Sequence, residues 1–464
     1  MPTDVESEVV AVELRVRNQE LHDAGLVCGG GDTEPRSSVV HRLKPVDRGR
    51  DAWTILIAGF IFEAFFWAHA DLVILIQGFP MCFGVFQNYY SHLPEFQQDS
   101  DNIALIGVLA QGLPFLAAPV STMLTKRFPR YHRHQIWIGW PMLILGLLAA
   151  SFAQSVDALI GTQGVLYGVG FVTVTYPIVG MINEWFVARK GMAFGVISSA
   201  SGATGAVMPF VIEALLARYG YRTTLRACAV AMTVLTAPLI PLFKDRLPAS
   251  EQAVLARTDW SFLRKPLFWV FASAILIQGL GFFFPVVFLP SYASALGLPS
   301  MQGALLVALM CIAQVLGQLF FGYMSDRQSV SFLAVVCCVA ASAAAFVFWG
   351  MGKSIAFLAA FSLVYGFFGF GFGTMRVAMG RAVSDDPATV FTIFSIYVFL
   401  MGVGNVLVGP ISAALLSPSR GGLARSSYAA GKYEGTVVLT GASSLAAGLV
   451  LALWHGYDKV LRTK

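Results

Sequence analysis

The sequence predicts an all-α polytopic membrane protein with twelve transmembrane helices in two six-helix bundles. Of its 464 residues only 12% are charged and 56% are hydrophobic, and the mean hydropathy is +0.69. Soluble domains carry about 25% charged residues, so most of the surface of this protein must face lipid. Apolar runs of about 20 residues recur, and each can cross a hydrocarbon core of ~30 Å. Short segments of the two halves also match each other.

The apolar runs define the organisation of the chain. A tail (1–52), an N-terminal six-helix bundle (53–243), a polar linker (244–265), a C-terminal six-helix bundle (266–455) and a short tail (456–464) are expected. The tail lacks the apolar core of a signal peptide. The twelve spans run roughly over 53–86, 103–124, 135–153, 158–181, 192–216, 225–243, 266–291, 303–324, 331–350, 355–378, 389–415 and 435–455.

The distribution of basic residues predicts the orientation. With the N-terminus inside, 24 of the 31 lysines and arginines fall in inside segments. This bias follows the positive-inside rule, so both termini are expected in the cytoplasm. The plasma membrane is the expected location of the protein. The basic residues are spread over short loops, which argues against a nucleic-acid partner. We expect the protein to lie in the lipid bilayer and to be a monomer.

The two halves repeat at an offset near 200 residues. Leu124–Arg127 corresponds to Met324–Arg327, and Gly202–Pro209 corresponds to Gly402–Pro410. Duplicated bundles around a midplane site are typical of alternating access.

The first span is too long for one crossing. Its 34 residues would form a helix of about 51 Å at 1.5 Å per residue. Residues 68–77 therefore read as an insertion, although Ile74–Gly78 matches Ile275–Gly279 in the second half and argues the other way.

The stretch 183–226 carries small residues at helical spacing between two basic clusters. Gly191, Gly195 and Gly202 share one helix face, which allows another backbone to approach closely. We expect this helix to be a packing and pivot surface inside the N-terminal bundle. The second cluster, Arg218, Arg222 and Arg226, lies on the outside against the charge bias, so we expect it to clamp the loop there to neighbouring helix ends.

Several classes of protein are disfavoured. The six cysteines form no CxxC pair, and only His69 among the histidines lies in an apolar run, so neither a metal site nor a catalytic site is expected. No phosphate-binding loop of the G-x-x-x-x-G-K-S/T type is present, so ATP is not the direct energy source. We therefore expect no enzyme and no cofactor, with proton coupling as the open alternative.

The loop Gly322-Tyr323-Met324-Ser325-Asp326-Arg327 resembles the G-x-L-A-D-R motif of the major facilitator superfamily. The resemblance implies the twelve-helix major facilitator fold and a gating role for Asp326 and Arg327, with the Asp326 carboxylate at a neighbouring helix N-terminus. An ordinary polar loop with one ion pair is the alternative. In the first-half copy Lys126 stands where the acid would be.

A second resemblance is to monocarboxylate-transporter-like proteins of the fungal branch. Its motif is Phe186-x-x-Arg189-Lys190-Gly191-Met192-Ala193-x-Gly195, supported by Asp47-Arg48-Gly49-Arg50-Asp51-Ala52-Trp53. Arg189 and Lys190 are candidate gating residues, or loop clamps and orientation signals. Carboxylate-carrying relatives use a lysine in helix 1 and an Asp/Arg pair in helix 8. Span 1 contains no lysine and span 8 no charge, so the cargo is expected to differ from lactate.

Two charges at membrane depth are candidates for transport. Glu63 lies ten residues into span 1, near the midplane, where it could bind a coupling proton or serve only as a structural hydrogen-bond partner. Arg376 lies near the cytoplasmic mouth of span 10, where it could bind an anionic substrate or snorkel to the interface.

Polar and aromatic residues of the spans complete the predicted substrate site. Aromatic walls with a few amides suit a moderately apolar organic molecule, although each side chain alone could serve packing. The candidates besides Arg376 are Tyr365, Asn88, Tyr176, Gln278, Gln314 and Asn405.

The function expected from these patterns is secondary active or facilitative transport of a small organic solute, monocarboxylate-like or another metabolite, by alternating access. Proton coupling through Glu63 would make it a symporter. Export of a secondary metabolite and a solute receptor that does not transport are the alternatives.

Overall fold

The computed structural model describes residues 46–67, 86, 89–91, 93–205, 208–247, 258–416, 428, 431 and 433–462. Within these ranges the chain is helical and contains no strand. The predicted insertion 68–77 and Asn88 lie outside the described residues.

The helices of the first half precede the linker and those of the second half follow it. In the first half they are α2 (Arg50–Trp67), α4 (Ile103–Leu116), α5 (Ala118–Arg127), α6 (His132–Ala150), α7 (Val156–Leu159), α8 (Tyr167–Trp185), α9 (Lys190–Gly205) and α10 (Met208–Thr236). In the second half they are α12 (Pro266–Phe282), α13 (Phe284–Ala295), α14 (Ser300–Ser325), α15 (Val330–Ala343), α16 (Ile355–Thr374), α17 (Arg376–Val383), α18 (Pro387–Leu416) and α19 (Glu434–Arg462).

Short irregular turns extend or join these helices. The 3₁₀ turns are η1 (Pro94–Asn102), η2 (Pro129–Tyr131), η4 (Ala237–Leu242) and η5 (Trp260–Arg264). Two π turns, η3 (Ile160–Leu166) and η6 (Ala344–Trp349), continue α7 into α8 and extend α15.

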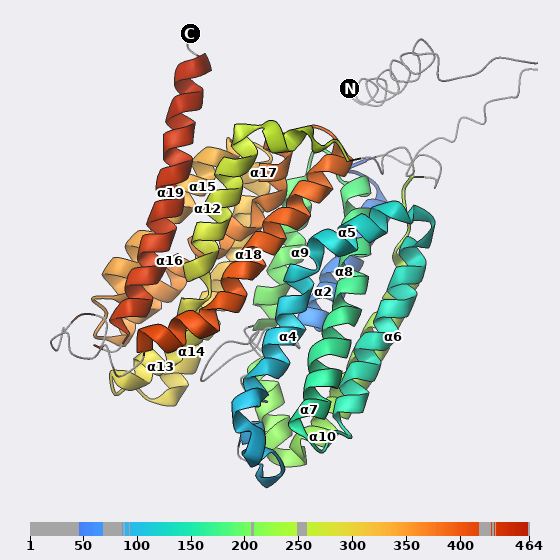
Figure 1. Ribbon diagram of the computed structural model, residues 1–464, viewed down its shortest axis with the longest axis vertical. Helices are drawn as coiled ribbons and strands as arrows, with labels where there is room; N and C mark the ends of the chain where they lie inside the picture. The colour runs from blue at the N-terminus through green and yellow to red at the C-terminus, as the bar shows by residue number, and fades with distance from the viewer. Residues whose placement is uncertain are drawn as a thin grey trace, which may run out of the picture.

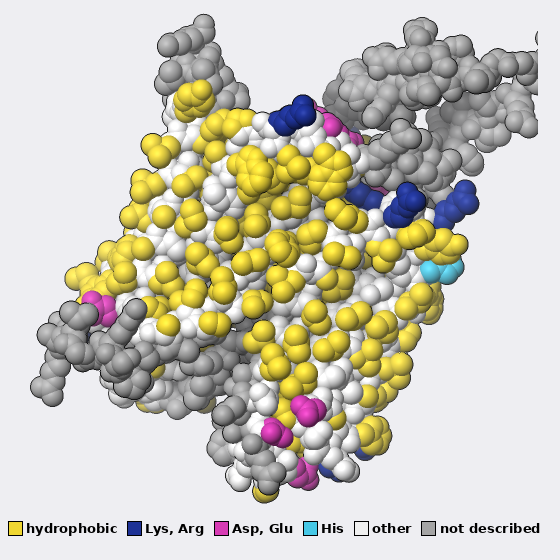
Figure 2. Space-filling model, in the orientation of Figure 1, with side chains coloured by type: hydrophobic (Ala, Val, Ile, Leu, Met, Phe, Trp, Pro, Cys, Tyr) yellow, Lys and Arg dark blue, Asp and Glu magenta, His cyan; other side chains and the backbone are white. Residues whose placement is uncertain are grey.

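Among the described residues, eight helices are long and apolar enough to cross a membrane, and nine if the α4–α5 pair, bent by 48°, counts as one span. The other three predicted spans, 53–86, 135–153 and 192–216, contain α2, α6 and α9, which do not pass this test as described. The observed helices are thus consistent with the predicted order. Figure 2 shows hydrophobic side chains across the middle of the face over α12, α18 and α19, as lipid exposure requires.

Prolines explain two breaks within spans. Pro119 lies in the first turn of α5, where its missing N–H interrupts the hydrogen bonds that would continue α4. Pro285 has the same place in α13, directly after the break at Phe283. Gly220 breaks α10 instead. Its φ of +73° suits glycine, and it turns the chain from the end of span 5 into span 6.

The two halves lie side by side, with α4 and α9 of the first half next to α18 and α14 of the second (Figure 1). The small residues of α9 face α14. A Cβ built on Gly195 would lie 2.6 Å from the carbonyl oxygen of Gln318 and 3.0 Å from the Cα of Gly322. Close backbone approach is therefore confirmed. The expected location inside the N-terminal bundle is wrong in part, because the closest partner of this face belongs to the second half.

The arginine cluster around Gly220 clamps its loop as expected. Arg226 donates from Nε to the Ser151 hydroxyl over 3.1 Å, and its guanidinium lies over the Phe152 ring. Arg222 pairs with Glu95 of η1 over 3.6 Å. These contacts fasten the turn of α10 to η1 and to the residues that follow α6.

Candidate functional site

A cavity of about 170 Å³ lies between the two halves. Its wall combines α2, α4, α8 and α9 of the first half with α12, α14, α16, α17 and α18 of the second. The apolar part of the wall is dominated by phenylalanine: Phe115, Phe171, Phe194, Phe282, Phe283, Phe370 and Phe394. Its volume is below the roughly 300–1,000 Å³ of drug-sized sites, so in this state it suits a compact molecule.

Polar groups on this wall come from both halves. They are Glu63, Thr175, Tyr176, Ser198, Ser201, Gln314, Gln318 and Arg376. Four of the predicted site residues, Glu63, Tyr176, Gln314 and Arg376, are therefore brought together at one cavity.

Arg376 is the first residue of α17, directly after the break at Met375 that ends α16. Its Nε and Nη1 atoms are buried, and no described group accepts a hydrogen bond from them. Burying charged N–H groups without acceptors costs several kcal/mol. The wall therefore offers an unsatisfied cation to an anionic ligand.

Glu63 and Tyr176 complete the charged part of the cavity. Glu63, on α2, is 4% exposed. The Tyr176 hydroxyl donates to the carbonyl oxygen of Pro114 over 2.7 Å, and Tyr176 lines the cavity together with Arg376 and Glu63. A carboxyl and a guanidinium from opposite halves thus face one space.

Three of the other predicted substrate residues, Tyr365, Gln278 and Asn405, lie outside the cavity wall. Tyr365 is fully buried and donates from its hydroxyl to the carbonyl oxygen of Phe282, behind the cavity wall. Gln278 and Asn405 carry buried side-chain atoms that have no hydrogen-bond partner within the described part of the chain, and neither lines the cavity. Their assignment to substrate stays a prediction.

The two halves are fastened at one end of the molecule by Lys126, Asp326 and Arg381, which we call the latched end. The Asp326 carboxylate accepts hydrogen bonds from the backbone N–H groups of Gly191 and Met192, over 2.9 and 2.8 Å. It also pairs with Arg381 over 2.7 Å. Asp326 thus caps the N-terminus of α9 across the interface, where the helix dipole favours an anion.

Lys126 makes the corresponding contact from the first half. Its ammonium group donates to the Thr258 hydroxyl over 2.9 Å and to the carbonyl oxygen of Ala388, in the first turn of α18. Lys126 and Asp326 therefore occupy corresponding positions in the two halves but carry opposite charges. Asp326 accepts hydrogen bonds from backbone N–H groups of α9, whereas Lys126 donates to a backbone carbonyl of α18.

Asp47 is a residue of this end that the sequence reasoning did not single out. Its carboxylate accepts from the N–H groups of Val187, Ala188 and Arg189 over 3.1, 2.9 and 2.9 Å. Asp47 has a φ of 57°, a conformation that aspartate tolerates better than most residues. The feature of the sequence that could have identified Asp47 is its place in the segment 47–53, which resembles monocarboxylate-transporter-like proteins.

The remaining gating candidates differ in their surroundings. Lys190 is 3% exposed, and burial together with the Arg381 charge lowers its pKa to about 8 although Asp47 and Asp386 favour the charge. Arg189 is exposed. The Arg327 guanidinium lies over the Tyr323 ring, 4.3 Å from its centroid, and the ion-pair partner of Asp326 is Arg381 instead.

A second cavity, of about 460 Å³, opens at the latched end beside Lys190 and Arg381. Arg381 is already paired with Asp326, and Asp385 also lines this space. The cavity between the halves differs from it in that Arg376, Gln314 and Gln318 carry buried polar atoms there with no hydrogen-bond partner among the described residues.

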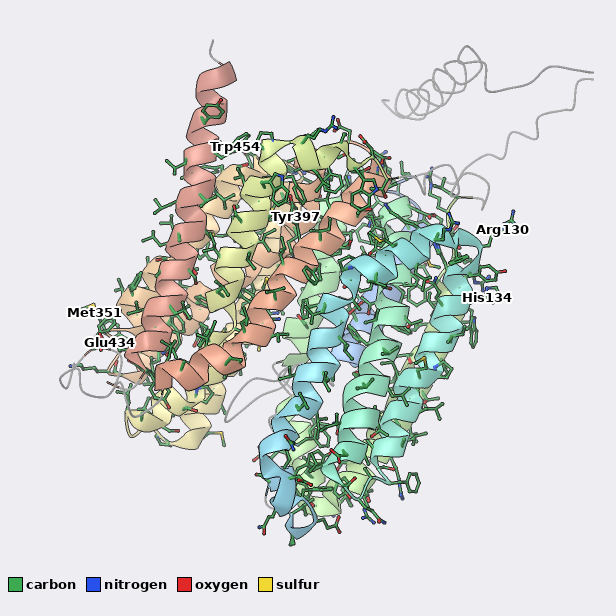
Figure 3. The ribbon with its side chains drawn as sticks, in the orientation of Figure 1. Arg130, His134, Met351, Tyr397, Glu434 and Trp454 are labelled. Carbon is green, nitrogen blue, oxygen red and sulfur yellow. The ribbon has the colours of Figure 1, made fainter. Side chains whose placement is uncertain are left out.

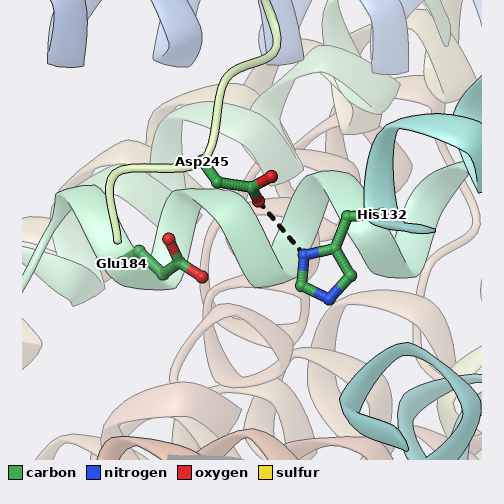
Figure 4. Close-up of side chains that lie close together, drawn as sticks. All are labelled: His132, Glu184 and Asp245. Carbon is green, nitrogen blue, oxygen red and sulfur yellow. Dashed lines mark hydrogen bonds and ion pairs between the residues drawn. The ribbon is translucent and has the colours of Figure 1, made fainter. Parts of the chain in front are cut away.

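His132, the first residue of α6, lies beside Glu184 of α8 and Asp245, which follows η4 (Figure 4). Its Nδ1 lies 3.1 Å from the Asp245 carboxylate and its Nε2 lies 3.0 Å from the carbonyl oxygen of Thr125. Glu184 accepts from the N–H of Arg246 over 3.1 Å. Possible ligand atoms of His132, Glu184 and Asp245 lie within 4.8 Å of one another, but the ring nitrogens already have protein partners.

The charge of Asp245 decides the protonation of this histidine. Burial opposes a charge on the ring, but the hydrogen bond and the negative charge of Asp245 outweigh it and raise the pKa of His132. This cluster was hard to predict, because its three residues are far apart in the chain and His132 lies outside the apolar spans.

Comparison with known proteins decides the family. The family model of the Major Facilitator Superfamily matches residues 81–407. The chain belongs to the major facilitator superfamily. The human organic anion transporter MFSD10 (TETRAN) has a similar fold, with a TM-score of 0.58 at 12% identity over 87% of this chain and 100% of that one.

Relatives of this superfamily member fall into two groups. The chain is 25% identical to "MFS transporter asaE" of Aspergillus flavus over 81% of this chain and 83% of that protein. It is 24% identical to the "Fujikurins efflux protein" of Gibberella fujikuroi, over 82% and 80%. It is also 24% identical to human monocarboxylate transporter 12, over 85% and 80%. The protein is thus an integral, multi-pass membrane transporter of small organic solutes.

Proposed function

We propose that this transporter carries a compact organic anion through the cavity between its halves, with Arg376 as the group that binds the anionic end. The observation that carries this proposal is the buried Arg376 guanidinium, whose Nε and Nη1 have no acceptor among the described residues, in a wall rich in phenylalanine. A carboxylate supplies two acceptors in the geometry that a guanidinium prefers.

The latched end is proposed to face the cytoplasm, with both termini on that side. The excess of Lys and Arg in the segments on that side supports this orientation. The structure then corresponds to a state closed towards the cytoplasm. Breaking the Asp326 and Lys126 contacts would lead to the inward-open state, as alternating access requires. We further propose a plasma-membrane location, a monomer and no enzymatic activity.

Glu63 is proposed to carry a coupling proton. It is buried on the same cavity wall as Arg376, so a change in its charge alters the electrostatics of the anion site. Export of a metabolite is the second candidate, and the efflux protein and transporters among the fungal relatives favour it.

The proposal is tested by counterflow of labelled 3-phenylpropionate in proteoliposomes of purified full-length protein. Arg376→Gln is expected to abolish saturable flux. Arg130→Gln removes an exposed charge at the latched end and is expected to leave flux unchanged; Arg130 points away from the protein (Figure 3). Glu63→Gln is expected to remove the pH dependence of flux. Flux that persists in Arg376→Gln at the wild-type level would exclude Arg376 as the anion site.

A further inference from the structure

Gln314 holds the two halves together at the cavity. It lies on α14 of the second half and is 3% exposed. Its amide Nε2 donates to the hydroxyl of Ser201, on α9 of the first half, over 2.9 Å. Both side chains line the cavity.

The orientation of this amide is set by the serine. The Ser201 hydroxyl donates its single hydrogen to the carbonyl oxygen of Ser198 over 2.8 Å. While it makes this bond, the Ser201 hydroxyl accepts from Gln314, so the amide nitrogen faces Ser201 and the amide oxygen faces away from it.

The amide oxygen that results is a buried acceptor without a donor. Gln314 Oε1 has no hydrogen-bond partner among the described residues, and neither has Oε1 of Gln318, one helical turn further along α14. Residues four apart share a helix face, and both line the cavity. Buried acceptors without donors are destabilising, so the wall is built to receive donors from a ligand.

We propose that Gln314, with Gln318 beside it, binds a hydroxyl or N–H group of the transported molecule while Arg376 binds its anionic group. The substrate class is then a compact, largely apolar organic acid that also carries a hydrogen-bond donor. Phenylalanine side chains of the same wall contact its apolar body. The part assigned to Arg376 rests on the proposed function, whereas the part assigned to Gln314 stands on its own geometry.

A matched pair of ligands tests the acceptor. The probes are 3-(4-hydroxyphenyl)propionate and its O-methyl ether, 3-(4-methoxyphenyl)propionate, titrated calorimetrically into the purified full-length protein. The hydroxyl donates a hydrogen bond and the ether does not, so the wild type is expected to bind the hydroxy acid about 3–10-fold more tightly. Gln314→Met keeps the length of the side chain and is expected to bring this ratio to about 1.

Two further variants separate recognition from folding. Gln302→Met changes a glutamine of the same helix outside the cavity wall and is expected to keep the wild-type ratio. Ser201→Ala leaves Gln314 in place but frees its amide to rotate, so the ratio is expected to fall here as well. A ratio that stays at the wild-type value in both Gln314→Met and Ser201→Ala would overturn the inference.

The outcomes distinguish this inference from the proposed function. If Arg376→Gln abolishes binding of both acids but Gln314→Met keeps the preference for the hydroxyl, the acceptor role fails and the anion site stands. If Arg376→Gln has no effect while Gln314→Met removes the preference, the acceptor role stands and the anion site fails. Should neither acid bind, 2-(4-hydroxyphenyl)ethanol and its O-methyl ether are titrated, and no saturable binding of these alcohols either would overturn both.

Discussion

The close approach of α9 and α14 at Gly195 predicts how the latched end responds to a single methyl group. In Gly195→Ala the added Cβ would lie 2.6 Å from the Gln318 carbonyl oxygen. An ordinary van der Waals contact begins at about 3.4 Å, so the helices must separate by about 0.8 Å or more there. The backbone of both helices is involved, so no flexible side chain can absorb the shift.

This separation acts on the Asp326 cap one turn away. The hydrogen bonds from Gly191 and Met192 to Asp326, now 2.9 and 2.8 Å, would lengthen to about 3.6 Å or more and lose most of their energy. Charge-assisted hydrogen bonds contribute about 1.5–3 kcal/mol each. Losing about 3 kcal/mol in total shifts the equilibrium between the closed and open states of this end by roughly 100-fold.

Accessibility of the latched end measures this shift. A cysteine introduced at Ala188, which lines the cavity of that end, is labelled with a membrane-impermeant maleimide. Labelling is expected to be about tenfold faster or more in Gly195→Ala. Gly161→Ala is the control, because a Cβ there would meet nothing within 4 Å. Equal labelling rates in wild type, Gly195→Ala and Gly161→Ala would refute the reasoning.

Three further predictions follow from single contacts. Asp326→Asn weakens both the α9 cap and the Arg381 pair and is expected to lower counterflow several-fold; undiminished flux would exclude a gating role. The raised pKa of His132 means that its pairing with Asp245 stabilises the fold fully below about pH 6.5 and that this stabilisation is lost as pH rises through the raised pKa. Tm should therefore fall over that range in wild type and be flatter in His132→Gln, and equal slopes would contradict the assignment. Gly220→Ala places a Cβ on a residue at φ 73° and ψ 170°, a region that is essentially restricted to glycine, and is expected to cost about 1–3 kcal/mol of stability. In a chain of this length that lowers Tm by about 1–3 °C, and an unchanged Tm would show that the turn tolerates the methyl group.

The order of the spans was predictable because bilayer thickness fixes the length of an apolar helix. The position of Asp326 could also be anticipated, because its loop motif implies an acid at a helix N-terminus. The structure adds the identity of that helix, α9, and the partner Arg381.

The partner of the α9 face was not predictable in the same way. Small residues at Gly191, Gly195 and Gly202 show that a backbone approaches, but a pattern along one helix does not say from which half it comes. Asp47 and His132 were missed for a related reason. Their roles depend on contacts with loops more than 50 residues away in the chain.

The substrate candidates divide by geometry rather than by residue type. Gln314 and Gln278 are both buried glutamines in predicted spans, yet only Gln314 lines the cavity. The difference lies in the rotation of each helix about its axis, which hydropathy does not determine where a span is apolar all round.

The most direct test of the central claim is the affinity of the purified protein for one carboxylate and for its isosteric amide. Wild type is expected to bind 3-phenylpropionate at least tenfold more tightly than 3-phenylpropanamide, because only the carboxylate pairs with the buried Arg376 guanidinium. In Arg376→Gln the two affinities should become equal. An affinity ratio in Arg376→Gln that matches the wild-type ratio would contradict the account.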